Sequence, residues 1–263
     1  MASTTEITVS QLSRLIGLPN SPTIIDIRED GEFAADPRLI PGTQRHADAS
    51  GPGLGKGYAG QSVVVVCRQG LHPSQGVSAW MRQGIDAQSL EGGYDAWRKS
   101  GQLLFRADRL PKRDDRDRTI WVTRARPKVV RIACPWLVRR FIDPKAVFLF
   151  VAPSEVAAVA DRFQATPFDV ADAFWGDRGE KCTFDVMVDE FGLESDALSR
   201  LALIVRGADT GRPDLTPQSG GLLAASLGFS RMFRDDLAQL EAAMVLYDAF
   251  YRWCRDASNE THS

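Results

Sequence analysis

Residues 63–72 read VVVVCRQGLH, four β-branched residues followed by a cysteine and a short loop that contains a glycine. A continuous β-branched run is typical of a strand that is buried on both faces, as in a parallel sheet. Open α/β sheets bind ligands at the carboxyl ends of their strands, where this pattern puts Cys67. Residues 74–81 have the pattern of a helix. We therefore expect backbone N–H groups of the loop and of this helix to surround the Cys67 sulfur, and such donors stabilise a thiolate.

Taken alone, Cys67 supports two interpretations equally well. Cysteine is among the residue types that are most often buried, so a cysteine that ends an all-valine strand can simply belong to the hydrophobic core. The alternative is a reactive nucleophile. The rest of the first hundred residues decides between them.

The composition is that of a globular protein. The chain has 263 residues, of which 44% are hydrophobic and 25% charged, and its formal net charge is -2. This length fits two ordinary domains, and the charge gives no general attraction to nucleic acid or acidic lipid. Because we find neither an apolar run that could span a bilayer nor a signal-peptide pattern, we expect a cytoplasmic protein without a membrane partner.

The number and spacing of cysteines and histidines limit which disulfides and metal sites the chain can form. The four cysteines are Cys67, Cys134, Cys182 and Cys254, and no two of them form a CxxC pair. This scatter predicts neither a disulfide framework nor a zinc finger. Histidine occurs only three times, which argues against an all-histidine metal site.

Strands and helices alternate through the first hundred residues. We predict strands at 7–9, 23–28, 63–66 and 87–90. Helices are expected after an N-cap at Ser10, from Glu29 and after residues 91–93, with a turn over 37–42. Alternation at this spacing predicts a parallel βαβ sheet.

Four short motifs in this order resemble a rhodanese homology domain. They are Asp26-Ile27-Arg28 with Glu32-Phe33, Ile40-Pro41-Gly42, Cys67-Arg68-Gln69-Gly70 and Gly92-Gly93-Tyr94-Asp95-Ala96-Trp97. The resemblance implies an α/β fold with a parallel sheet flanked by helices, and a sulfurtransferase whose only cofactor-like group is a persulfide on Cys67. The six-residue loop 67–72 is similar in length to that of the sulfurtransferases, whereas the arsenate reductases and phosphatases of this fold have a longer loop.

The resemblance assigns a role to each part of the loop. The Cys67 thiolate would attack the outer sulfur of thiosulfate or of another persulfide and pass it to a thiol or cyanide acceptor. The substrate-binding residues would be Arg68, Gln69, Gly70, Leu71 and His72. Arg68 would receive the departing anion. Asp26 and Arg28 are expected to support the loop through a buried ion pair.

The last loop residue departs from the family pattern. His72 stands where thiosulfate-using rhodaneses usually have Arg or Thr. A neutral imidazole holds a sulfonate less well than a guanidinium at pH 7. We therefore predict weak thiosulfate:cyanide activity and a protein or low-molecular-weight persulfide as donor. The alternative is that His72 is a surface residue without a role.

The second half is predicted to be a separate, mainly α-helical α+β domain. We place the first domain at 1–102, a solvated mixed-charge linker at 103–118, the second domain at 119–256 and a disordered tail at 257–263. Strands are predicted at 120–123, 129–132 and 146–151. Helices are predicted from Pro135 with Cys134 as N-cap, after Ser154, and over 196–205, 222–227 and 233–255, with 168–189 irregular.

This half resembles the C-terminal domain of the ChrB-like chromate-resistance family. The matching segments are RIACPWLVRRFID at 131–143, GEKCTFD at 179–185, RGADTGRPDL at 206–215, and residues 247–249 and 253–256. The resemblance implies a link to chromate resistance and to chromate-responsive regulation. Asp177 stands where we expect a histidine in this family.

Six residues of the second half are candidates for a site, because we place them in or beside polar loops, where sites are usually built. They are Cys134, Asp143, Cys182, Asp185, Asp209 and Asp214. A metal or oxyanion site is one interpretation, without direct support for a metal. Capping and turn roles are the favoured alternative, since aspartate is a natural N-cap and turn former.

Three functions remain open from the sequence. The leading one is a rhodanese-type sulfurtransferase, with a small sulfur donor and a thiol acceptor, linked to chromate resistance or redox stress. The second is a chromate- or redox-responsive regulator with a non-catalytic or persulfide-sensing rhodanese domain, for which chromate or another oxyanion would be the ligand. The third is a non-catalytic scaffold. No helix-turn-helix with a basic recognition helix stands out, so DNA binding has no support.

Overall fold

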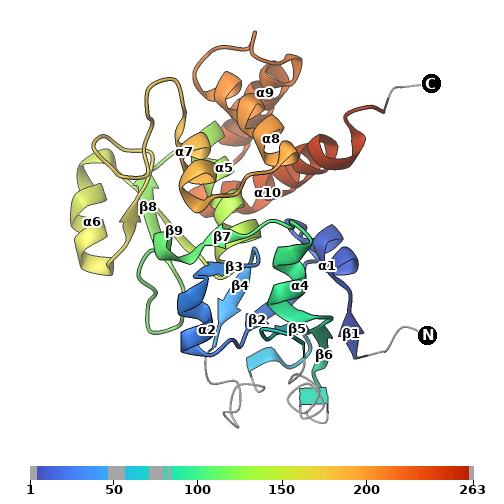
Figure 1. Ribbon diagram of the computed structural model, residues 1–263. Coiled ribbons are helices and arrows are strands. Elements are labelled where there is room, and N and C mark those ends of the chain that lie inside the picture. The colour runs from blue at the N-terminus through green and yellow to red at the C-terminus, as the bar shows by residue number, and fades with distance from the viewer. Residues whose placement is uncertain (1–4, 47–56, 71–79, 82–83, 261–263) are drawn as a thin grey trace. The chain divides into compact units, whose positions relative to one another are not determined.

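The computed structural model describes residues 5–46, 57–70, 80–81 and 84–260 (Figure 1). The chain forms two compact units, one made of residues 1–108 and 140–142 and the other of residues 109–139 and 143–263. The division at residue 108 falls inside the segment that the sequence predicts as a linker. That segment is more ordered than a solvated linker, because it contains strand β7 (Phe105–Arg106) and a 3-10 turn (Ala107–Arg109).

The first unit is built on a parallel five-stranded sheet in the order β1-β6-β5-β2-β4. The strands are β1 (Glu6–Ile7), β2 (Thr23–Asp26), β4 (Thr43–Arg45), β5 (Ser62–Val66) and β6 (Asp86–Leu90). Strand β5 is central, and the side chains of its four valines are at most 4% exposed. The prediction of a parallel sheet around a fully buried strand is confirmed.

Three described helices accompany this sheet, α1 (Val9–Leu15), α2 (Asp30–Ala35) and α4 (Gly93–Lys99). The predicted cap at Ser10 is wrong, because Thr8 caps α1 in a reciprocal capping box with Gln11. The expected turn over 37–42 contains the short strand β3 (Arg38–Leu39), which pairs antiparallel with β7. The predicted helix at 74–81 lies mostly outside the described residues.

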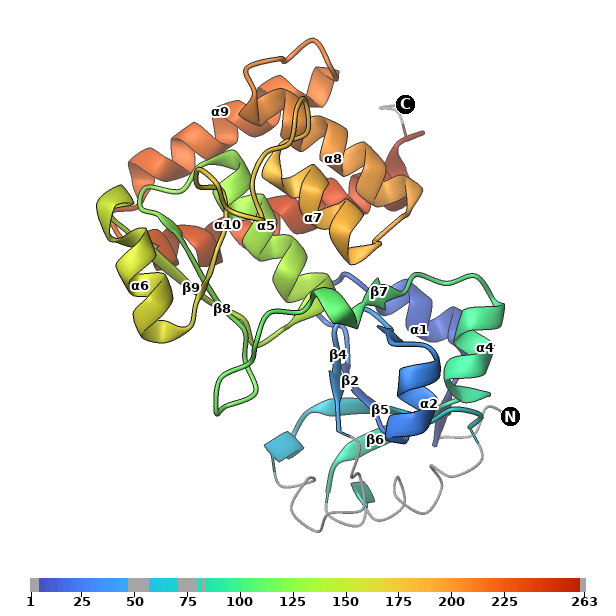
Figure 2. The same ribbon diagram turned by 60° about the vertical axis from the view of Figure 1, so that its left-hand side comes forward.

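The second unit has a small parallel sheet between two helical layers (Figures 1 and 2). The sheet order is β10-β8-β9, with β8 (Ile120–Arg124), β9 (Val147–Val151) and β10 (Thr166–Pro167). Helix α6 (Val156–Phe163) covers one side. The other side carries α5 (Val129–Leu137), α7 (Thr183–Phe191), α8 (Asp196–Asp209), α9 (Pro217–Met232) and α10 (Asp236–Arg252).

Alternation along β8 explains this layering. Val122 packs against Val156 of α6, whereas its neighbour Trp121 contacts Phe168 and Trp175. Successive side chains of a strand point to opposite faces of the sheet, so a strand buried on both faces supports a layer on each. The predicted α+β class of the second half is confirmed.

The predicted strand at 129–132 is wrong. These residues begin helix α5, and Pro135 lies inside the helix rather than at its first position. Arg131 is the only residue of α5 that is not buried, so a single polar side chain interrupts an otherwise apolar run. Its β-branched residues therefore resemble a buried strand. A π-helical turn (Val138–Ile142) follows.

Several other boundaries differ from the predictions. Helix α7 occupies part of the segment expected to be irregular, and α8 continues to Asp209. Ser154 lies in a 3-10 turn (Pro153–Glu155) ahead of α6. The helix expected over 233–255 begins only at Asp236, because residues up to 232 belong to α9, and a π-helical turn (Trp253–Ala257) follows α10.

Within the described residues, no helix combines the length and the apolar character needed to cross a membrane.

Candidate functional site

Cys67 directly follows the central strand β5, and its side chain is nearly buried. The backbone N–H of Gly70 donates to its Sγ at 3.0 Å. The loop also rests on the start of α4, since Tyr94 N–H donates to Cys67 O at 2.8 Å and Asp95 N–H donates to Arg68 O at 2.9 Å. The thiol is thus held where the sheet ends, with a backbone donor directed at its sulfur.

Close backbone contact between the loop and α4 requires glycine. A Cβ on Gly93 would lie 2.7 Å from Gly70 N and closer still to Cys67 O, and Gly93 has a φ of +61°. A Cβ on Gly70 would in turn lie 2.8 Å from Gly92 N. Real Cβ atoms do not approach backbone this closely, so these two glycines of the sequence motifs fix how the Cys67 loop sits.

The guanidinium of Arg68 lies between two carboxylates. Its Nη1 is 3.9 Å from Glu32 Oε1, and its Nε is 3.6 Å from Asp95 Oδ2. The Arg68 side chain is 54% exposed. No local pattern predicts either pair, because Glu32 and Asp95 each lie about thirty positions from Arg68 along the chain. Arg68 therefore does not present an unpaired positive charge beside Cys67.

Asp26 and Arg28 form a fully buried ion pair with 2.7 Å between Asp26 Oδ2 and Arg28 Nη2. Arg28 also donates to the carbonyl oxygens of Asp36 and Arg38. Its guanidinium lies 3.6 Å from the centre of the Tyr94 ring, a cation–π contact. Burial raises the pKa of Tyr94 to about 12. Tyr94 therefore contacts both Arg28, through its ring, and the Cys67 loop, through its backbone N–H.

The remaining loop residues complete the placement of the predicted site. Gln69 is exposed. Leu71 and His72 lie outside the described residues. Of the predicted first-domain residues that are described, Gly70 contacts the Cys67 sulfur, Arg68 contacts Glu32 and Asp95, and Arg28, paired with Asp26, contacts the Tyr94 ring.

In the second unit, Cys182 and Asp185 form a local pair at the start of α7. The backbone N and the Sγ of Cys182 donate to Asp185 Oδ2 at 3.0 and 3.1 Å. Asp185 Oδ1 is 3.1 Å from Arg206 Nη2. Burial, followed by the charge of Asp185, raises the pKa of the Cys182 thiol, so this sulfur stays protonated near neutral pH.

Asp209 and Cys134 lie where α5, α7 and α8 pack together. Asp209 is the last residue of α8 and accepts from Val130 N at 3.4 Å. Burial, followed by repulsion from Asp169, raises the pKa of Asp209 to about 6. Cys134 is fully buried, and burial raises the pKa of its thiol. Asp185 and Asp209 were expected in loops, but both lie in helices. The Asp185 carboxylate accepts from the N-cap residue of its own helix, and the Asp209 carboxylate accepts from Val130 near the start of α5.

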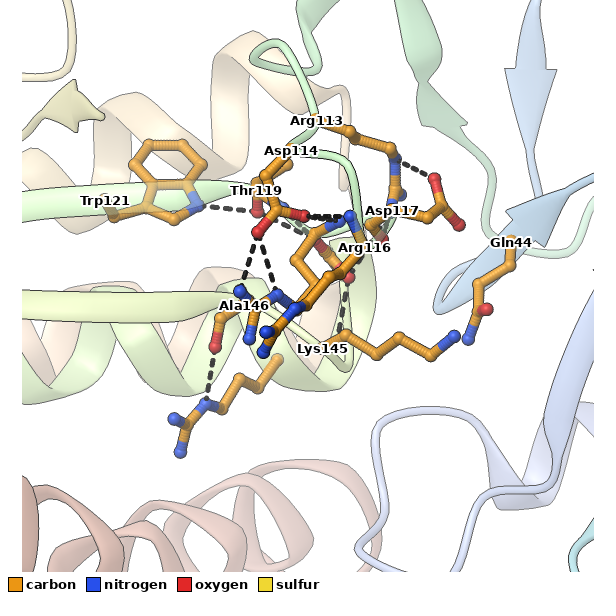
Figure 3. Close-up of polar contacts among 12 residues, drawn as sticks. Gln44, Arg113, Asp114, Arg116, Asp117, Thr119, Trp121, Lys145 and Ala146 are labelled. Atoms are coloured by element: carbon orange, nitrogen blue, oxygen red, sulfur yellow. Dashed lines mark hydrogen bonds and ion pairs between the residues drawn. The ribbon is translucent and has the colours of Figure 1, made fainter. Parts of the chain in front are cut away.

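Two predicted residues stand apart from this group. Asp143 is buried and accepts from Thr119 N and Oγ1 at 2.7 and 2.8 Å. Figure 3 shows the Trp121 indole directed at Thr119 and Arg113 beside Asp117. Asp143 thereby anchors the start of β8, a structural role. Asp214 is exposed in the turn after α8.

Sequence reasoning missed Asp169. Its Oδ2 lies 3.0 Å from Arg124 Nη2 and 3.2 Å from Arg131 Nε. Thr183 Oγ1 donates to Asp177 Oδ1 at 2.8 Å. Asp177 occupies the position where the resemblance leads us to expect histidine. Asp169 lies two residues after β10, near the carboxyl edge of the sheet, but this two-residue strand has no recognisable pattern in the sequence. Among the residues placed in the structure, no group of three or more His, Cys, Asp or Glu is arranged to hold a metal ion.

Comparison with known proteins identifies both halves. The family model of the ChrB C-terminal domain matches residues 121–254, and that of the rhodanese-like domain matches residues 8–100. Protein ChrB of Cupriavidus metallidurans is 34% identical over 148 residues, which cover 55% of this chain and 44% of that protein. The chain thus spans less than half of the length of this curated relative.

Solved structures match the first half. A protein of Staphylococcus saprophyticus is 28% identical, with a TM-score of 0.33, and the match covers 37% of this chain and 97% of that one. A rhodanese-like domain protein from Staphylococcus aureus is 29% identical, with a TM-score of 0.31, over 35% of this chain and 90% of that one. The two family models and the ChrB relative carry the assignment: the chain belongs to the ChrB family and joins a rhodanese-like domain to a ChrB C-terminal domain.

Proposed function

We propose that the protein is a rhodanese-type sulfurtransferase that carries a persulfide on Cys67. The observation that supports this most is the Gly70 N–H directed at Cys67 Sγ at 3.0 Å. A backbone donor at this distance stabilises an anionic sulfur, whether thiolate or persulfide. The loop holds this donor rigidly, because it is hydrogen-bonded to the start of α4.

The reaction consists of two nucleophilic displacements at sulfur, and it needs no external oxidant or reductant. The Cys67 thiolate attacks the outer sulfur of a donor RSS⁻, the donor S–S bond breaks, and RS⁻ departs. The outer sulfur of the resulting Cys67 persulfide is then attacked by an acceptor thiolate or by cyanide, and the Cys67 thiolate leaves. The donor and the acceptor are small thiol-based molecules in this proposal.

Burial of the other three cysteines supports Cys67 as the carrier. Burial raises the pKa of Cys134 and Cys182, and it raises the pKa of Cys254 to about 11. A thiol with a raised pKa has little thiolate at neutral pH.

The ChrB C-terminal domain supports a cytoplasmic role in chromate resistance or redox stress, with chromate or another oxyanion as a further partner. The arginines beside Asp169 and Asp185 do not add support for a bound oxyanion. Arg124 and Arg131 are both paired with Asp169, and Arg206 is paired with Asp185.

A single-turnover transfer experiment tests the proposal. The protein is incubated with inorganic hydrogen disulfide (HSS⁻), desalted, and mixed with cyanide, and thiocyanate is measured. We expect one equivalent of thiocyanate per chain, unchanged in Cys254→Ser and absent in Cys67→Ser. Thiocyanate at the same level from Cys67→Ser would refute the role of Cys67.

A further inference from the structure

We propose that Glu32 and Asp95 select the sulfur donor by holding Arg68 in ion pairs, so that Cys67 accepts sulfur from a low-charge hydropersulfide in preference to dianionic thiosulfate. This inference rests on the proposed function and adds the class of donor. It is independent of His72, which lies outside the described residues.

Arg68 is the positively charged residue next to the reacting cysteine in the chain. It follows Cys67 directly in the chain, so its guanidinium is the described positive charge nearest in sequence to the reacting sulfur. Two carboxylates face it at 3.9 and 3.6 Å, and Asp95 is also 3.6 Å from Arg98 Nη2. The charge of Arg68 is therefore compensated by Glu32 and Asp95 before any anion arrives.

Both carboxylates lie in the first turn of a helix, and the Glu32 side chain is also hydrogen-bonded there. Glu32 lies in the first turn of α2 and its Oε2 accepts from Glu29 N at 3.2 Å. Asp95 lies in the first turn of α4, and its backbone N–H holds Arg68 O. Acidic side chains are favourable in a first helical turn, so neither carboxylate is free to withdraw from Arg68 without cost.

Thiosulfate and hydrogen disulfide load Cys67 with the same sulfur but carry different charges. Thiosulfate brings two negative charges, and its reaction with the Cys67 thiolate gives the Cys67 persulfide and sulfite, SO₃²⁻. Hydrogen disulfide, HSS⁻, brings one and gives the same persulfide and HS⁻. Both reactions balance, so the donors differ in charge and in leaving group. Because Arg68 is already paired with Glu32 and Asp95, its guanidinium offers little attraction for the second negative charge of thiosulfate.

The test measures how fast Cys67 is loaded by each donor, using the mass of the intact protein. The variant is the double substitution Glu32→Gln and Asp95→Asn, which removes both charges with little change of shape. Glutamine also suits the capping position of Glu32. Asp108→Asn is the matched control, because Asp108 is an exposed partner of Arg106 at 2.8 Å in the same unit.

We expect the ratio of the thiosulfate rate to the hydrogen disulfide rate to rise roughly tenfold in the double variant and to stay constant in Asp108→Asn. A ratio that changes by less than about twofold in the double variant would overturn the inference.

Arg68→Gln keeps the test decisive if the double variant does not fold. Here both carboxylates stay and their counter-charge is lost, so the ratio should fall below that of the wild type. An unchanged ratio would count against the inference. If neither donor loads wild-type Cys67, the proposed function itself fails, and that outcome is distinct from a loaded protein with unaltered selectivity.

Discussion

Gly93→Ala should displace the Cys67 loop from the start of α4. Two costs add at this position. An L-residue at a φ of +61° costs about 1 kcal/mol, and the new Cβ would press on the backbone of Cys67 and Gly70, where overpacking costs a further ~1–3 kcal/mol. Displacing the loop would also weaken the hydrogen bond from Tyr94 N to Cys67 O. We expect a total loss of about 2–4 kcal/mol of stability and a slower transfer of sulfur to Cys67.

Gly101→Ala separates these two costs. Gly101 has a φ of +68°, but a Cβ there would meet nothing within 4 Å. The control should therefore lose only about 1 kcal/mol. Hydrogen exchange of the β5 amides, followed by mass spectrometry, reports the stability of the sheet, and intact mass reports Cys67 loading. If Gly93→Ala matches Gly101→Ala in both measurements, the contact between the loop and α4 does not have the role assigned to it.

Two further predictions concern buried charges. Arg28→Met leaves Asp26 buried without its cation and removes the contact with Tyr94, so we expect a loss of about 3–5 kcal/mol in urea unfolding, partly restored by adding Asp26→Asn. Equal stability of the single and double variants would contradict this account. The raised pKa of Asp209, about 6 in the folded protein, means that the folded state binds its proton more tightly than the unfolded state. This carboxyl therefore destabilises the fold increasingly as pH rises from about 4 through 6, and Asp209→Asn should stabilise the protein by about 2–3 kcal/mol at pH 8 but hardly at pH 4. Thermal unfolding at both pH values checks the sign, and a variant that is less stable at pH 8 would show that the carboxylate is stabilising.

The parts of the fold with a local signal were predictable. Strand β5 is four valines, and a strand at the centre of a parallel sheet is buried on both faces, so sequence and environment agree. Helix α5 lacked such a signal. Its residues 129–132 favour a strand locally, and only packing against α7, α8 and α10 makes them helical. Tertiary contacts outweighed local preference there.

Helix α7 was missed although a signal existed. Cys182 and Asp185 have the spacing of a capping box. Cysteine is not among the usual capping residues, so this pattern does not by itself predict a helix start. Hydrophobic residues at 184, 187, 188 and 191 follow at helical spacing.

One part of the candidate site was likewise predictable from the sequence, and another part was not. Cys67 and its glycines follow from motifs within a few residues of one another. The partners of Arg68 come from α2 and α4, which are far from it in sequence and near it only in the folded chain. Asp169 likewise reaches Arg124 and Arg131 only through the sheet and α5. No single-sequence pattern contains such pairs.

The central claim is that Cys67 carries sulfur, and the mass of the intact protein tests it most directly. After incubation with hydrogen disulfide and removal of excess donor, the wild-type chain should gain the mass of one sulfur atom. Fragmentation should place that atom on Cys67, and the gain should be absent in Cys67→Ser. A wild-type chain without added sulfur, or with the sulfur on Cys134, Cys182 or Cys254, would contradict the account.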